Sequence, residues 1–218
     1  MKYKILLIIL LTLINFCGFT QKLPAFESKC VVVNDNPKKI NYTYCAVYLN
    51  HNINYSGNYS GLIDLLLYSD KNTTIVFHLT GNGGFIQGLK PLINSIKNSR
   101  ATVIMSPIGD IYSSHAFIAI SSGNFVATGE GIVMFHTGSG WNMEKPHCWK
   151  HGWTKDRGQL AYYKCVENNK KYSKMHHEYL RKLVQPILTT KELKRFDEGF
   201  EVIMTIKELE KRMKERKK

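Results

Sequence analysis

Two kinds of segment alternate along residues 61–136. GLIDLLLYSD and FIQGLKPLINSIKNS carry apolar residues at helical spacing. TTIVFHLT, ATVIMS, NFVAT and GIVMFH are short apolar runs, rich in β-branched residues, of the kind that form buried strands. Strands that alternate with helices of about ten residues predict βαβ crossovers. We therefore expect an α/β fold with a mainly parallel sheet.

The pattern changes after residue 136. A polar stretch that contains Trp and Gly comes first, and a long helical pattern follows at 159–184. Pro186 ends this pattern, and TKELKRFDEG predicts a further short helix. We expect one α/β domain at 61–209, with a C-terminal helical region, and a basic tail at 210–218.

The first residues have the organisation of an export signal. Two lysines precede an apolar run at 5–14, and small and polar residues follow it. The run is too short to span a bilayer comfortably, so residues 1–20 are interpreted as a cleaved signal peptide. Residues 21–60 would then form an N-terminal extension. The expected location is extracytoplasmic, periplasmic or secreted, and membrane association would need an uncleaved N-terminus or a lipid on Cys17.

The mature chain would keep four cysteines. These are Cys30, Cys45, Cys148 and Cys165. An even number of cysteines in an exported chain predicts disulfides. Proximity in the sequence favours the pairs Cys30–Cys45 and Cys148–Cys165.

Metal and nucleic acid are the other partners to consider. A metal site built by Cys148 with His147 and His151 lacks a matching CxxC pair. Lys and Arg outnumber Asp and Glu by 30 to 17, which would suit an anionic partner. Much of this excess lies at 170–182 and 207–218, which are typical of solvated helical faces, and no nucleic-acid motif accompanies them. We expect no metal, no cofactor and no nucleic acid.

Three features occur in the order that acyl-transfer chemistry requires. GNGG at 81–84 supplies backbone amides after a strand, Ser114 begins a helix, and His136 ends a strand. A serine hydroxyl is a poor nucleophile unless a base takes its proton, and the tetrahedral oxyanion needs preorganised donors. Glycines let amides approach the oxyanion because they lack a Cβ. The pattern predicts Ser114 as nucleophile and His136 as base.

These residues also carry a family resemblance. The stretch 61–209 resembles the Clp protease proteolytic subunit, within the Clp/crotonase superfamily. TGNGGF is similar to its Asn-Ser-Pro-Gly-Gly turn, SSHAFIAISSG to its Ala-Ser-Met-Gly nucleophile helix, and VMFH to its Val-Met-Ile-His strand. The resemblance implies repeated βαβ units, and it assigns the same roles to Ser114 and His136. It implies an oxyanion hole formed by the backbone amides of Gly83, Gly84 and His115.

The acid of the triad lies in a segment that departs from the family. FDEGFEVIMTIKEL replaces the family's Asp-Arg-Asp-x-Phe-x-Ser segment. Aligning VIMTIKEL with the family's downstream helix places Glu201 at the Asp position, with Asp197 and Glu198 as alternatives. Glutamate can orient a histidine as aspartate does. In exported relatives such as signal peptide peptidase A the base is a lysine, so Lys145 is the alternative to His136.

The resemblance implies a serine peptidase that acts on polypeptides outside the cytoplasm, in a ring-like homo-oligomer. The alternative is a non-catalytic binding or assembly module of the same fold, with Ser114 and His136 vestigial. An acyl-CoA enzyme is disfavoured because CoA esters are not expected where a signal peptide leads. Ser113 is expected to be a helix cap or a small-residue substitute, and the His115 side chain is expected at the rim of the site.

Overall fold

The computed structural model describes residues 26–35, 40–50, 59–84, 86–137 and 159–216. Predictions that fall outside these residues concern the signal peptide, Lys145, His147, Cys148 and His151.

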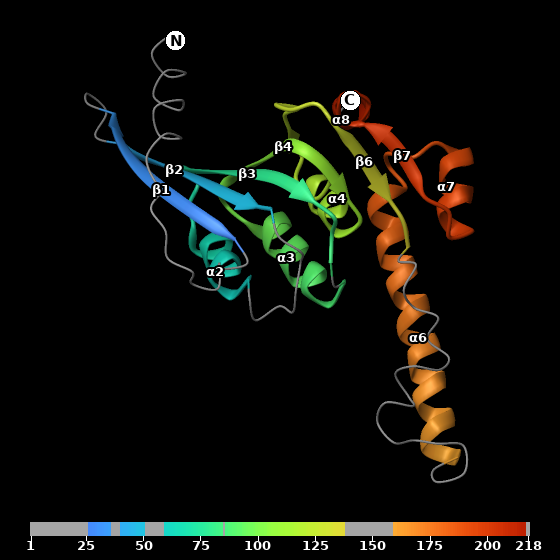
Figure 1. Cartoon of the computed structure of the whole chain (residues 1–218). Helices are drawn as coiled ribbons and strands as arrows, with labels where there is room; N and C mark the ends of the chain where they lie inside the picture. The colour runs from blue at the N-terminus through green and yellow to red at the C-terminus, as the bar shows by residue number, and fades with distance from the viewer. Residues whose placement is uncertain (1–25, 36–39, 51–58, 85, 138–158, 217–218) are drawn as a thin grey trace, which may run out of the picture.

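The described residues form one mixed sheet with helices packed against it (Figure 1). Its seven strands are β1 (Glu27–Asp35), β2 (Ile40–Leu49), β3 (Thr73–Gly81), β4 (Thr102–Tyr112), β5 (Asn124–Phe125), β6 (Ile132–Phe135) and β7 (Val202–Thr205). The order across the sheet is β1-β2-β3-β4-β6-β7, and β5 also pairs with β4. The inner pairs are parallel, whereas β1–β2 and β6–β7 at the edges are antiparallel. The predicted α/β fold with a mainly parallel sheet is confirmed.

Six helices are described along the chain. They are α2 (Ser60–Tyr68), α3 (Ile86–Asn98), α4 (Ser114–Ala119), α6 (Gln159–Val184), α7 (Thr190–Asp197) and α8 (Ile206–Glu215). Helices α2 and α3 are the crossovers that the parallel pairs β2–β3 and β3–β4 require, and both lie on the same face of the sheet (Figure 1). In the described part of the chain, no helix has the length and apolar character needed to cross a membrane.

Alternation along β3 explains which face the helices cover. Ile75, Phe77 and Leu79 are fully buried, while the residues between them are only partly buried. Leu62 and Leu66, one helical turn apart on α2, belong to the same core. The apolar spacing that predicts helix and strand in this region is thus the spacing that builds the core.

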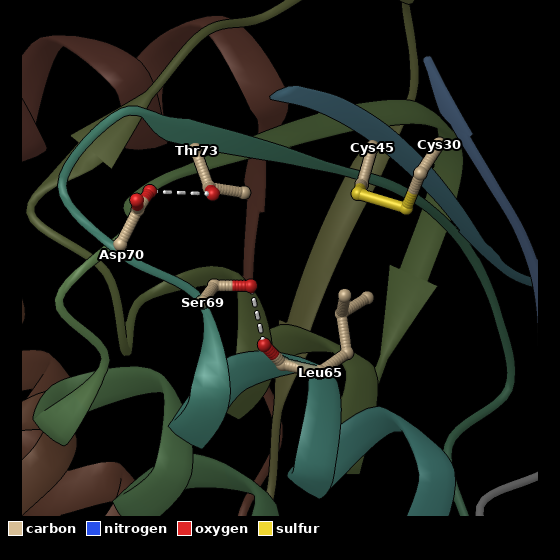
Figure 2. The surroundings of a disulfide bond; sticks show 6 residues. All are labelled: Cys30, Cys45, Leu65, Ser69, Asp70 and Thr73. Carbon is tan, nitrogen blue, oxygen red and sulfur yellow. Dashed lines mark hydrogen bonds between the residues drawn. A yellow bond between two sulfur atoms is a disulfide. The ribbon is translucent and has the colours of Figure 1, made fainter. Parts of the chain in front are cut away.

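The segment expected to be an N-terminal extension contributes β1 and β2 to the sheet. Cys30 and Cys45 are directly opposite each other in the antiparallel pair, with Cα atoms 4.1 Å apart, and form a disulfide (Figure 2). This predicted pair is confirmed. Cys165 is also disulfide-bonded, and its predicted partner Cys148 lies outside the described residues.

The C-terminal residues differ from the expected helix and tail. VIMT forms the edge strand β7, and Thr205 then caps α8 by accepting a hydrogen bond from the Glu208 amide. Ile206, Leu209 and Met213 make one buried stripe on α8. Part of the expected basic tail is therefore the second half of an amphipathic helix that packs on the core.

Candidate functional site

A sharp turn joins β4 to α4 through a single residue, Ser113. Among the described residues it is the only non-glycine with a positive φ, and its φ and ψ are 54° and −121°. Its amide donates to the Met134 carbonyl of β6 at 2.8 Å, and its carbonyl accepts from Phe117 in α4. Such a conformation costs of order 1–3 kcal/mol and is concentrated at functional sites. Its side chain makes no capping hydrogen bond, so the expected capping role is not seen.

The glycine turn at 81–84 packs directly against this elbow. Gly83 has a φ of +94°, and a Cβ built on it would lie 2.6 Å from Ser113 Cβ and 2.9 Å from the Tyr112 carbonyl oxygen. Only glycine allows this approach, because a side chain there would overlap the backbone of the elbow. The turn and Ser113 are therefore close neighbours.

Ser114 and His115 bind the glycine turn through their side chains. Ser114 is 1% exposed, and its hydroxyl donates to the Gly84 carbonyl at 2.9 Å. The Gly83 amide donates to His115 Nδ1 at 3.0 Å, and His115 is fully buried rather than at the rim. The Gly83 amide is thus already engaged, which conflicts with the oxyanion role expected for it.

His136 follows β6, which pairs on one side with β4, the strand that ends at the elbow, and on the other with β7. Its backbone is two residues beyond Met134, whose carbonyl accepts from Ser113. Phe135 pairs with Val202 in the antiparallel register, so the next step along the two strands sets His136 opposite Glu201. Burial lowers the pKa of His136, and the negative charge of Glu201 partly offsets this shift. A neutral imidazole beside a carboxylate can accept a proton.

The two other candidate acids have partners elsewhere. Asp197 accepts hydrogen bonds from the Arg181 guanidinium at 3.0 Å, which ties α7 to α6. Glu198 lies 3.9 Å from Lys194 within the same helical region. Of the three carboxylates, Glu201 is the one whose charge acts on His136.

Two residues acquire significance that sequence reasoning missed. The resemblance aligns Ser114 with the nucleophile and leaves Ser113 as a helix cap or a small-residue substitute, and nothing in the residue type reveals the φ of Ser113 between strand and helix. The sequence predicts a backbone role for His115 and a side chain at the rim, whereas its buried imidazole contacts the turn. Nothing in a single sequence identifies a contact between residues 32 positions apart.

The described residues contain no group of His, Cys, Asp and Glu side chains that could hold a metal ion. No model of a known protein family matches this chain, and no curated protein matches it significantly.

Proposed function

We propose that this protein is a serine hydrolase of the Clp/crotonase type that cleaves peptide bonds, with Ser113 as the nucleophile. The observation that carries the proposal is the backbone of Ser113, a strained strand-to-helix elbow set against a glycine turn. An elbow of this kind exposes a serine hydroxyl at the end of a strand in serine hydrolases. The strain needs an explanation, and presenting a nucleophile provides one.

Ser113 replaces Ser114, the residue expected from the sequence, for two reasons. Ser114 is almost fully buried, and its proton is directed at the Gly84 carbonyl. Ser113 is only partly buried and its hydroxyl makes no bond that would explain it as a cap. A nucleophile must be reachable by substrate and must hand its proton to a base rather than to a carbonyl.

In the proposed reaction, Ser113 Oγ attacks the scissile carbonyl carbon while His136 takes its proton. Glu201 stabilises the imidazolium, and His136 then protonates the leaving amine. Water, deprotonated by His136, releases the acyl group and restores the serine. The oxyanion would accept from the amide of Ser114, the residue after the nucleophile, and from the Gly84 amide.

The location and assembly of the enzyme are part of the proposal. The Cys30–Cys45 disulfide supports an oxidising compartment, as expected for a chain exported by a signal peptide at 1–20. The Clp-like motifs support polypeptide substrates and a homo-oligomer.

Labelling with a fluorophosphonate tests the nucleophile. The wild-type protein should react, and mass mapping should find the adduct on Ser113. Ser113→Ala should abolish labelling and peptide hydrolysis. Ser114→Ala should still be labelled, more slowly, because the turn loses one anchor. Ser95→Ala, which removes a buried serine on α3, is the control and should react normally.

Each contrary result has a definite meaning. Labelling lost in Ser114→Ala but kept in Ser113→Ala returns the role to Ser114. Activity that survives His136→Ala but not Lys145→Ala makes the base a lysine. A folded wild type that neither reacts nor cleaves peptides replaces the enzyme by the non-catalytic module.

A further inference from the structure

His115 is a polar side chain in the core, and its position calls for an explanation. It is the second residue of α4 and is fully buried. Burying a polar ring costs free energy unless hydrogen bonds compensate. The Nδ1 atom has such a bond, from the Gly83 amide at 3.0 Å, and the backbone of Leu49 lies close enough to interact with the ring, although Nε2 makes no hydrogen bond of good geometry within the described residues.

The ring also fills the space beside the first glycine of the turn. A Cβ on Gly81 would lie 3.2 Å from His115 Cε1 and 3.4 Å from Nε2. The imidazole therefore contacts the turn at two points, Gly81 and Gly83. Since the turn consists largely of glycine, it has few side chains of its own to fix its conformation.

The contact with Gly83 requires a neutral imidazole. An N–H can donate to Nδ1 only while that nitrogen keeps its lone pair, so the proton of the neutral ring is on Nε2. Burial lowers the pKa of His115 to about 4, and a hydrogen-bonding interaction with the backbone of Leu49 opposes this shift. At neutral pH the acceptor is thus available.

Ser114 binds the next residue of the turn as a hydrogen-bond donor, whereas His115 binds Gly83 as an acceptor. The Gly83 amide donates to His115, and the Gly84 carbonyl accepts from Ser114. Two successive residues of α4 therefore bind two successive residues of the turn. We call these two hydrogen bonds the turn clamp.

We propose that His115 is a positioning residue that, through the turn clamp, fixes the glycine turn against Ser113. The inference rests on the proposed function, because its catalytic consequence is the orientation of the Gly84 amide toward the substrate oxyanion. His115 itself touches neither substrate nor the transferred proton. It acts by preventing the turn from moving relative to the nucleophile, and misplacement of about 1 Å can cost a hundredfold in rate.

Three variants test the proposal. His115→Leu keeps an apolar body but removes the acceptor, and His115→Asn restores an acceptor close to the position of Nδ1. His176→Leu, which removes a partly buried histidine on α6, is the matched control. For each variant we measure amide hydrogen exchange at Gly83 and the rate of fluorophosphonate labelling. Both measurements are made well below the thermal midpoint of that variant, so that the protein is folded.

We expect Gly83 exchange to be about tenfold faster in His115→Leu, as for one lost hydrogen bond, and labelling to be roughly 10–100-fold slower. His115→Asn should recover part of both losses, and His176→Leu should match the wild type. Unchanged exchange in His115→Leu would overturn the clamp. Faster exchange with wild-type labelling would overturn the positioning role. If the wild type is not labelled at all, the proposed function fails, and exchange alone decides whether His115 holds the turn.

Discussion

Replacing Gly83 with alanine would place a methyl group where the backbone of the elbow already lies. The added Cβ would be 2.6 Å from Ser113 Cβ, 2.9 Å from the Tyr112 carbonyl oxygen and 3.0 Å from the Ser114 nitrogen. Two of these three atoms belong to the backbone, so no side-chain rotation relieves the overlap. Either the turn or the elbow must move.

A second glycine separates this overlap from the backbone strain. Gly83 and Gly199 have φ values of +94° and +85°, and nothing lies within 4 Å of a Cβ added at Gly199. An alanine in such a conformation costs about 1–2 kcal/mol at either position. Overpacking adds roughly 1–3 kcal/mol at Gly83 alone. With about 2–4 °C per kcal/mol for a chain of this size, the two variants should have clearly different thermal midpoints.

Urea and thermal unfolding of the two variants measure the difference. We expect Gly199→Ala to lose the smaller amount of stability and Gly83→Ala to lose more. Folded Gly83→Ala should also react slowly with a fluorophosphonate, because the turn can no longer approach Ser113. Equal stability of the two variants would refute the close packing of turn and elbow. If Gly83→Ala is less stable than Gly199→Ala but is labelled as fast as the wild type, the packing of the turn against the elbow does not affect the reactivity of the site.

Two further predictions concern stability. Replacing Cys30 and Cys45 together by alanine should lower the free energy of unfolding by about 3 kcal/mol in urea denaturation, since the disulfide closes a loop with a sequence separation of 15; an unchanged midpoint would contradict this. The pKa of His115 is lowered to about 4 from 6.5, so between these pH values the unfolded chain binds a proton that the folded chain does not. The free energy of unfolding should therefore fall by roughly 3 kcal/mol in all as the pH drops through this window, and should level off below it. Urea midpoints compared at pH 7 and 4.5 should show a smaller acid loss in His115→Leu, and equal losses would count against the assignment.

The parts of the fold that the sequence predicts are those in which local periodicity and burial agree. Helices α2 and α3 and strand β3 have apolar residues at the spacing of their own element, so the pattern identifies them. The β1–β2 pair lies in the segment predicted as an N-terminal extension, outside the alternating pattern of 61–136. The alternation of Cys45, Val47 and Leu49 is nevertheless the signal of a strand with one buried face.

In the candidate site, residue types indicate which residues can take part in the chemistry but not how these residues are placed. GNGG, the serine pair and His136 were identified because the chemistry limits which residues can perform it. Which serine lies at the elbow depends on the residue at which β4 ends. If β4 were one residue longer, Ser114 would take the position that Ser113 now has. Glu201 was selected by aligning VIMTIKEL with a helix, yet the register of strand β7 is what sets it opposite His136. Strand ends and strand pairing are set by tertiary contacts, so the local pattern of apolar residues does not reveal them.

The pairing of β6 with β7 also orders events during synthesis. The two strands are neighbours in the sheet, although α6 and α7 lie between them in the chain. A chain made from its N-terminus can form β1 to β6 before the residues of β7 emerge. Glu201 joins Ser113 and His136 only when this last strand docks. In the proposed peptidase, the catalytic group would thus stay incomplete until the C-terminal strand of the chain had been made and had docked.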